Sequence, residues 1–181
     1  VGKGTELLKT YEPGRQLNAL SALGNGFAPA RAGQRPLLIG GGVGVPPLYG
    51  LCRNLIEAGA RPTVILGFNT EREVFYKEAF EKLGAEVLVA TADGSMGQKG
   101  FVTDVLRNIK EPATFFYTCG PEPMLKALDK ALAEGLEGEM SFEERMGCGF
   151  GACMGCSCET RYGAKRICKD GPVLERSEIL W

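Results

Sequence analysis

Short apolar runs alternate with amphipathic stretches along the middle of the chain. Apolar runs bounded by Gly, Pro or charged residues predict buried strands, and apolar positions that recur every three or four residues predict helices. The predicted strands cover residues 35–40, 62–67, 86–91 and 114–118, and the predicted helices cover residues 47–58, 71–83, 102–109 and 123–133. This alternation predicts an α/β fold with a parallel sheet covered on both faces, in which ligands bind beyond the carboxyl ends of the strands.

A last strand is predicted after the final long helix. Met140, Phe142, Glu144 and Met146 alternate along the chain, which predicts an extended segment with these four side chains on one side. This strand runs directly into a segment rich in cysteine.

Four cysteines in that segment have a recognisable spacing. Cys148, Cys153, Cys156 and Cys168 follow the pattern C-x4-C-x2-C, with the fourth after eleven further residues. This is the ligand spacing of a plant-type [2Fe-2S] cluster, which carries single electrons. Cys158 stands close to the ligands, and we expect it to be a small packed thiol rather than a fifth ligand.

The residues between the ligands favour a cluster over other uses of cysteine. Gly147, Gly149, Gly151, Ala152 and Gly155 leave the loop almost without side chains, so the backbone can direct N–H groups at the sulfurs. Structural zinc held by four thiolates is the alternative, but it prefers short C-x2-4-C pairs on two knuckles, whereas three ligands here share one loop. Disulfides are less favoured than either, because no secretory signal precedes the segment.

Composition excludes several kinds of chemistry. The 181 residues contain no histidine, which removes Rieske ligation, Cys-His zinc sites, histidine-held haem and imidazole-based catalytic triads. The net charge is −1 with interspersed charges, so no basic surface is predicted for nucleic acid or for a membrane. Apolar runs are far too short to span a bilayer. Seven cysteines without an export signal predict a reducing, cytoplasmic setting.

Two turns at the ends of predicted strands are candidate nucleotide-binding sites. A glycine run that includes Gly41, Gly42 and Gly44 separates the first strand from a helix, where the backbone can approach a pyrophosphate. It departs from G-x-G-x-x-G, and a purely structural tight turn is the alternative. The second turn follows the fourth strand as Cys119-Gly120-Pro121, and places a cysteine, the candidate catalytic residue, at the expected ligand edge. A buried thiol is the alternative for Cys119.

Together these segments resemble a known family. GGGVGVPPL followed by CGPEPML resembles the nicotinamide-binding module of ferredoxin reductase-like flavoproteins, in which the glycine run contacts the pyrophosphate and the CGP cysteine lies near the nicotinamide. ERMGCGFGACMGCSCET with KRICKDGPV, LGNGF at 23–27 and TADGSMGQKGFVTDV at 91–105 resemble the electron-transfer subunits of class 1B dihydroorotate dehydrogenases. The resemblance covers nearly the whole chain, and the cysteine segment is its most specific part.

The resemblance implies a domain organisation of the ferredoxin reductase type. It divides the chain into a remnant of an FAD-binding β-barrel at 1–33, an NAD-binding domain at 34–140 and a [2Fe-2S] domain at 141–181. Only part of the family's barrel is expected here, with strands within residues 3–27. Gly4 and Thr5 resemble the barrel turn that contacts the FAD phosphate.

The resemblance also implies a function. Dihydroorotate gives two electrons to the FMN of a separate catalytic subunit, the [2Fe-2S] cluster relays them singly, and FAD passes them as a hydride to NAD in pyrimidine biosynthesis. The partner would be that catalytic subunit in a hetero-oligomer. The alternatives are a reductase subunit that serves ferredoxin or a sulfur-reducing enzyme, and a nucleotide-binding module held together by zinc.

Three further residues carry expectations of their own. Asp93 follows the third strand, where an acidic group can accept hydrogen bonds from a ribose 2'-hydroxyl and repel a 2'-phosphate, which predicts a preference for NAD. An Asx-turn before Gly94 is the alternative. Phe150 and Met154 are apolar residues of the cysteine loop, and they either contact the partner or cover the cluster.

Overall fold

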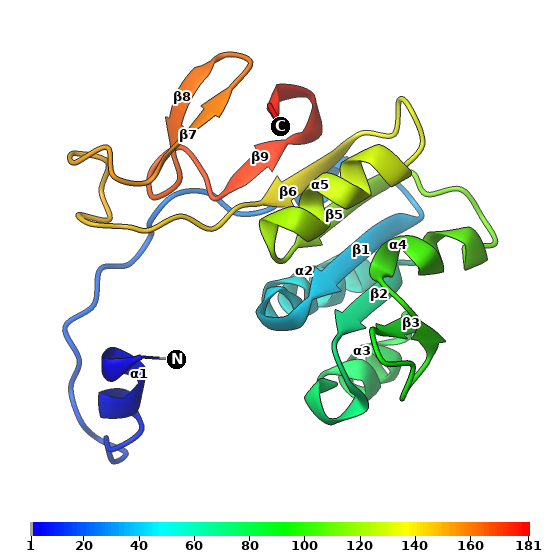
Figure 1. Cartoon of the computed structure of the whole chain (residues 1–181), viewed down its shortest axis with the longest axis horizontal. Coiled ribbons are helices and arrows are strands. Elements are labelled where there is room, and N and C mark those ends of the chain that lie inside the picture. Colours follow the sequence, from blue (N-terminus) through cyan, green and yellow to red (C-terminus); the bar gives the residue numbers. More distant parts are fainter. Residues whose placement is uncertain (1) are drawn as a thin grey trace.

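The larger body of the molecule is built around one sheet (Figure 1). The computed structural model describes residues 2–181, and its main sheet has seven strands in the order β4-β3-β2-β1-β5-β6-β9. These strands are β1 (Pro36–Gly41), β2 (Thr63–Phe68), β3 (Glu86–Thr91), β4 (Gln98–Lys99), β5 (Phe115–Cys119), β6 (Gly138–Ser141) and β9 (Val173–Glu175). Neighbouring strands are parallel except for β6 and β9, which are antiparallel. The predicted α/β fold is confirmed, with one antiparallel strand at its edge.

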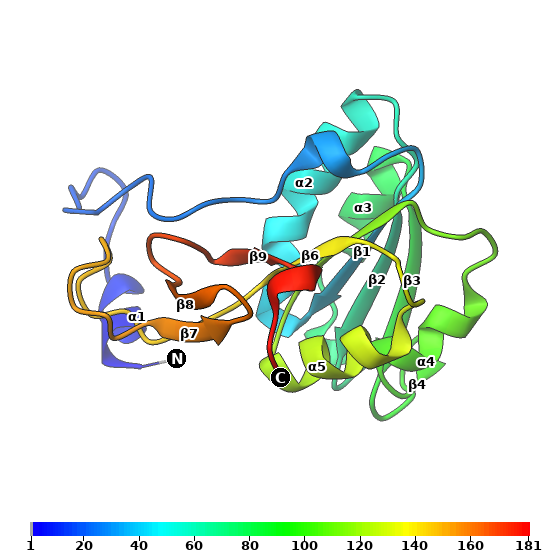
Figure 2. The same cartoon turned by 90° about the horizontal axis from the view of Figure 1, so that it is seen from above.

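Helices cover both faces of the sheet because its central strands are apolar on both sides. Helices α2 (Val45–Glu57) and α3 (Lys77–Leu83) lie on one face, and α4 (Val102–Val105) and α5 (Glu122–Ala131) lie on the other (Figure 2). Along β1, Leu38 packs into the core under α2, while Leu37 and Ile39 pack into the core under α4 and α5. Tyr117 is fully buried on the α2 face, and its hydroxyl donates to the Ala28 carbonyl at 2.8 Å.

Two predicted helices are shorter than expected. The segment 71–83 begins as the 3-10 turn Glu71–Glu73 and becomes helical only at Lys77, because Tyr76 has a φ of 64° and breaks the helix. Aromatic packing accompanies the break, with the Phe75 ring 5.2 Å from that of Phe68. The segment 102–109 likewise consists of α4 and the 3-10 turn Leu106–Asn108.

The predicted strand through Met146 is also shorter than expected. Strand β6 ends at Ser141, Met140 on it is fully buried, and Met146 beyond it is exposed. The reason is pairing: β9 opposes β6 only as far as Ser141, and one further bond joins the Phe142 N–H to the Pro172 carbonyl at 2.9 Å. Beyond Phe142 the backbone has no neighbouring strand to bond with, so the strand ends there.

A smaller body carries the cysteines. It contains the loop 147–156 and the antiparallel hairpin of β7 (Ser157–Thr160) and β8 (Gly163–Arg166). The chain then returns to the main sheet as β9, so the C-terminal segment belongs to both bodies. The domain boundaries at 34 and 141 stay a prediction.

The N-terminal segment differs from its expectation. Residues 3–27 form no strand: they contain α1 (Lys3–Leu8), which buries none of its side chains, and irregular chain after it. The predicted barrel strands are therefore wrong, because this segment has no neighbouring strand with which to form a ladder. Asn25 anchors the end of the segment through paired bonds with the Val173 N–H and carbonyl, both at 2.9 Å.

Across residues 2–181, no helix combines the length and the apolar composition needed to cross a bilayer.

Candidate functional site

A cleft of about 450 Å³ opens at the carboxyl ends of the parallel strands. The chain runs from β1 outward to β2 and β3, and then returns to the other side of β1 as β5, so the order of the strands reverses beside β1. This is the position at which open α/β sheets bind their ligands. Among the residues that line the cleft are Gly41, Gly42, Phe68, Asn69, Glu73, Phe101, Pro121 and Met124.

The two predicted turns interlock beside this cleft. A Cβ on Gly44 would lie 2.1 Å from the Cys119 carbonyl oxygen, and a Cβ on Gly41 would lie 2.5 Å from the Met124 sulfur. Only glycine allows the two turns to approach so closely. The glycines of this run therefore have a structural role as well as leaving backbone open to a ligand.

The predicted nucleotide residues divide into two groups. Gly41, Gly42 and Pro121 line the cleft, whereas Gly44 and Gly120 lie in the junction between the turns. The turn Gly42–Gly44 is 3-10 and is followed directly by α2, so its backbone stands at a helix N-terminus, which favours an anion. This arrangement can receive a pyrophosphate.

Asp93 does not line the cleft. Its Oδ1 accepts from the Ser95 N–H at 2.9 Å and from the Ser95 hydroxyl at 2.6 Å, and these bonds lower the pKa of the carboxyl. These bonds form the Asx-turn, which was the alternative interpretation of Asp93. Binding of a ribose hydroxyl by Asp93 stays a prediction.

Glu73 is the acidic residue that lines the cleft, and the sequence pattern did not predict it as a site residue. Its Oε2 accepts from the Asn69 N–H at 3.2 Å and from the Asn69 side-chain amide at 3.0 Å. Glu73 lies five positions beyond the end of β2, and the 3-10 turn at Glu71–Glu73 brings it back to the strand edge. The only sequence signal was the acidic GFNTERE segment after β2.

Cys119 ends β5 beside the glycine run, paired in register with Gly40. Burial raises the pKa of this thiol above its usual range, partly offset by a hydrogen bond with Ser141. The thiol is therefore neutral at pH 7 and is not an activated nucleophile.

The four cysteines of the smaller body form two pairs. The Cys153 N–H points at the Cys148 sulfur at 3.4 Å, and the Cys168 N–H points at the Cys156 sulfur at 3.4 Å. Within residues 2–181, no three His, Cys, Asp or Glu side chains converge on one point. Each iron of a [2Fe-2S] cluster takes two protein ligands, so two thiol pairs fit a binuclear cluster.

Backbone donors surround the first pair. Besides Cys153, the Ala152 N–H lies 3.2 Å from the Cys148 sulfur, and the Gly155 N–H lies 3.5 Å from the Cys153 sulfur. Bonds from the backbone, that of Cys153 first, lower the pKa of Cys148 to about 6. Such donors stabilise a thiolate and the additional negative charge of a reduced cluster. The residues present therefore fit the cluster that their spacing predicts.

Cys158 lies on β7 opposite Lys165 and packs against the core under α5. Burial raises the pKa of its thiol. Both observations agree with a packed thiol.

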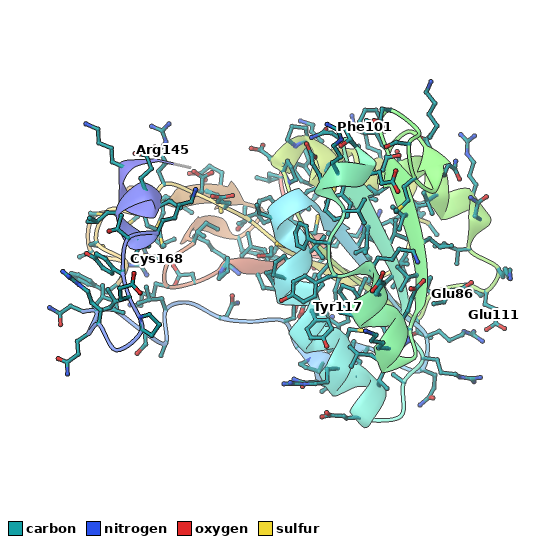
Figure 3. All side chains as sticks on the ribbon, turned by 90° about the horizontal axis from the view of Figure 1, so that it is seen from below. Glu86, Phe101, Glu111, Tyr117, Arg145 and Cys168 are labelled. Atoms are coloured by element: carbon teal, nitrogen blue, oxygen red, sulfur yellow. The ribbon has the colours of Figure 1, made fainter. Side chains whose placement is uncertain are left out.

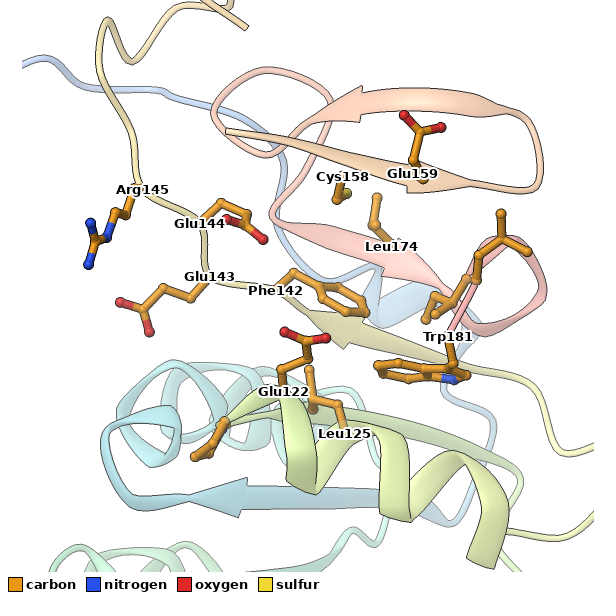
Figure 4. A pocket seen from close by; sticks show the side chains of 14 residues that line it. Glu122, Leu125, Phe142, Glu143, Glu144, Arg145, Cys158, Glu159, Leu174 and Trp181 are labelled. Carbon is orange, nitrogen blue, oxygen red and sulfur yellow. The ribbon is translucent and has the colours of Figure 1, made fainter. Parts of the chain in front are cut away.

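The two sites lie in different bodies, and a second cleft lies between these bodies. Figure 3 shows Cys168 and Arg145 in the smaller body and Phe101 in the larger. The second cleft, of about 540 Å³, has Gly120 on one wall and Cys158 on the other. The Phe142 and Trp181 rings lie 5.8 Å apart between α5 and the hairpin (Figure 4). Gly4 and Thr5 lie apart from both clefts, on the exposed helix α1.

Comparisons with known proteins agree with this arrangement. The family model described as oxidoreductase NAD-binding domain matches residues 38–130, and the one described as iron-sulfur cluster binding domain of dihydroorotate dehydrogenase B matches residues 143–180. The dihydroorotate dehydrogenase B (NAD(+)) electron transfer subunit of Geobacillus sp. (strain WCH70) is 47% identical over 99% of this chain and 71% of its own length. The chain belongs to this family. The corresponding subunit of Shouchella clausii (strain KSM-K16) is 46% identical over the same shares.

One solved structure extends the likeness to the whole fold. It is titled as a study of flavin-based electron bifurcation in the NADH-dependent reduced ferredoxin-NADP oxidoreductase, and it superposes with a TM-score of 0.80 at 31% identity. The match covers all of this chain and 65% of the other. The ferredoxin reductase-type fold of the electron transfer subunits is thus confirmed for this chain.

Proposed function

We propose that this chain transfers electrons within an NAD-dependent dihydroorotate dehydrogenase, between a separate catalytic subunit and NAD. The observation that carries the proposal is the arrangement of the four cysteines as two pairs with backbone N–H groups directed at their sulfurs. These cysteines lie in a segment that matches the family's cluster-binding domain, in a chain that also has a nucleotide cleft. Its cofactors are a [2Fe-2S] cluster, FAD and NAD. The chain supplies binding and electrostatics, while the cofactors supply the redox chemistry.

Cys148, Cys153, Cys156 and Cys168 are the proposed cluster ligands. When bound, a [2Fe-2S] cluster accepts and gives one electron at a time, which links the two-electron chemistry of dihydroorotate to that of NAD. The loop holds the sulfurs in pairs and directs N–H groups at them. No residue is required to act as acid or base on dihydroorotate, which agrees with the absence of histidine.

The cleft beside β1 is the proposed NAD site. Gly41 and Gly42 offer backbone to the pyrophosphate, and Pro121 lines the same cleft. The neutral thiol of Cys119 adjoins the place expected for the nicotinamide, where it can pack and donate a hydrogen bond without attacking the ring.

FAD binding through Gly4 and Thr5 stays a proposal. The two residues lie on α1, away from the clefts, and a measurement of FAD content in the Thr5→Ala variant tests their role. We also propose a cytoplasmic setting, because seven cysteines in one chain, four of them proposed cluster ligands, suit a reducing compartment.

The partner proposed here is an FMN-containing catalytic subunit. The alternative, a reductase that serves ferredoxin, is supported by the solved structure at 31% identity, but the subunits that serve dihydroorotate reach 47%. Residues of the smaller body and of the CGP turn line the same second cleft.

The direct test of the cluster is metal and sulfide analysis of anaerobically purified protein. We expect about two irons and two sulfides per chain with a red-brown absorption, following from a [2Fe-2S] centre. Serine at any of the four ligand positions should remove or destabilise the absorption, and Cys158→Ser should keep it. A colourless protein with one zinc per chain would contradict the proposal.

A further inference from the structure

Arg166 lies at the end of β8, two residues before Cys168. Its side chain is half-buried, and its Nη1 donates to the Gly151 carbonyl at 2.9 Å. Gly151 is between Cys148 and Cys153 in the loop. One side chain therefore joins the loop of the first ligands to the turn of the fourth.

Asp170 holds the guanidinium in this position. Its Oδ2 accepts from the Arg166 Nε at 2.9 Å and from the Arg166 backbone N–H at 3.0 Å. The Arg166 carbonyl in turn accepts from the Lys169 and Asp170 N–H groups at 3.0 and 2.7 Å. A planar guanidinium fixed at several atoms loses little freedom when it makes one more bond, so the contact with Gly151 is well oriented.

Two other bonds join the turn to the third ligand, and the Gly151 backbone also contacts the Cys168 sulfur. The Ile167 N–H donates to the Cys156 carbonyl at 3.0 Å, and the Cys168 N–H points at the Cys156 sulfur. The contact of Arg166 with Gly151 holds the part of the loop that carries the first pair. A loop of glycines has few contacts of its own to fix it there.

The same side chain is a permanent positive charge beside the thiols. Reduction adds one electron to the cluster without making or breaking a bond, so the centre becomes more negative by one charge. A nearby guanidinium favours the reduced form, and the Asp170 carboxylate opposes it.

We propose that Arg166 is a positioning residue of the cluster site. Its side chain binds the ligand loop to the turn that carries Cys168, and its charge raises the reduction potential of the cluster. The inference rests on the proposed function, because it requires a bound [2Fe-2S] cluster. Asp170 moderates the effect of the charge.

The test is a redox titration of the purified holoprotein followed by electron paramagnetic resonance, together with the rate of iron loss to a chelator. Arg166→Gln should shift the potential to more negative values and accelerate iron loss. Arg166→Lys should leave the reduction potential close to that of the wild type but should accelerate iron loss. A lysine keeps the positive charge but lacks the planar guanidinium that bonds Gly151 and Asp170 together. Asp170→Asn should shift the potential to more positive values.

The opposite signs expected for Arg166→Gln and Asp170→Asn separate an electrostatic role from a merely structural one. Arg161→Gln is the matched control, since it removes one positive charge at the other end of the same hairpin and should leave the potential unchanged. Equal potentials in the wild-type and Arg166→Gln proteins, or shifts of the same sign in Arg166→Gln and Asp170→Asn, would overturn the inference while leaving the proposed function intact. Wild-type protein without iron and sulfide would overturn both.

Discussion

At the scale of single residues, the sequence predicts those candidate site residues that belong to a short local motif. The four cysteine positions could be proposed from spacing alone because three of them share one short loop. Glu73 could not be proposed, because its place at the cleft depends on a 3-10 turn and on the break at Tyr76. Asp93 had two interpretations, and the structure shows the hydrogen bonds of the Asx-turn.

The choice between NAD and NADP tests which of the two acids acts. We expect Glu73→Gln to raise the affinity for NADP relative to NAD by ~10-fold, about 1.4 kcal/mol, because the negative charge on the cleft no longer repels a 2'-phosphate. The measurement is the dissociation constant of each nucleotide by calorimetry.

Asp93→Asn is the matched control for this substitution. It also removes one negative charge, but from a turn outside the cleft, and it should leave the ratio unchanged. A large change in the ratio for Asp93→Asn with none for Glu73→Gln would restore the original assignment of Asp93.

At the scale of elements, the strands were more predictable than the helices. The run 86–91 coincides with β3, because an apolar run between charged residues is read directly from sequence. The helix expected at 71–83 was broken by tertiary packing of Phe75 and Tyr76, which no local pattern encodes. Strand β9 was missed because its partner β6 lies more than thirty residues earlier in the chain.

The junction between the glycine run and the CGP turn gives a prediction about stability. Gly44 has an ordinary φ of −76°, so an alanine there is opposed by crowding alone, with the Cys119 carbonyl oxygen 2.1 Å and the Gly120 nitrogen 2.7 Å from its Cβ. We expect Gly44→Ala to lower the free energy of unfolding by about 1–3 kcal/mol and to weaken NAD binding, because the turns must separate. Chemical denaturation and calorimetry measure the two effects.

Gly50→Ala is the control for Gly44→Ala, because it adds the same methyl group at an uncrowded position. Gly50 is inside α2, and a Cβ there meets no atom within 4 Å. We expect this substitution to stabilise the protein by about 0.5–1 kcal/mol without changing NAD binding. Similar effects of the two alanines would show that crowding at Gly44 is not the cause.

At the scale of the whole molecule, one strand joins the two bodies. Strand β9 returns from the cysteine segment to the edge of the nucleotide-binding sheet, and Asn25 joins the N-terminal segment to β9. The sequence predicted a separate [2Fe-2S] domain at 141–181 and gave no sign that part of it would return to the main sheet. This return holds the cluster loop in a fixed relation to the nucleotide cleft.

The exposed tip of the cluster loop predicts a contact surface. Phe150 and Met154 are 63% and 52% exposed, so both present apolar area outward. We expect Phe150→Glu and Met154→Glu to weaken binding to the catalytic subunit by at least ~10-fold while the visible absorption is retained.

The control for this surface is Tyr162→Glu, which alters an exposed aromatic residue at the turn of the β7–β8 hairpin. It should bind the partner normally. Loss of absorption in the Phe150 and Met154 variants would instead identify these side chains as a cover over the cluster.

Dihydroorotate-dependent NAD reduction by the assembled complex measures whether electrons pass through the cluster. Purified catalytic subunit is combined with the complete electron transfer subunit in its wild-type, Cys153→Ser or Cys158→Ser form, and the rate is compared with cluster content. We expect the rate of NAD reduction to follow cluster content, so that it is normal with Cys158→Ser and lost with Cys153→Ser. Equal NAD reduction by the cluster-free Cys153→Ser complex would contradict this expectation.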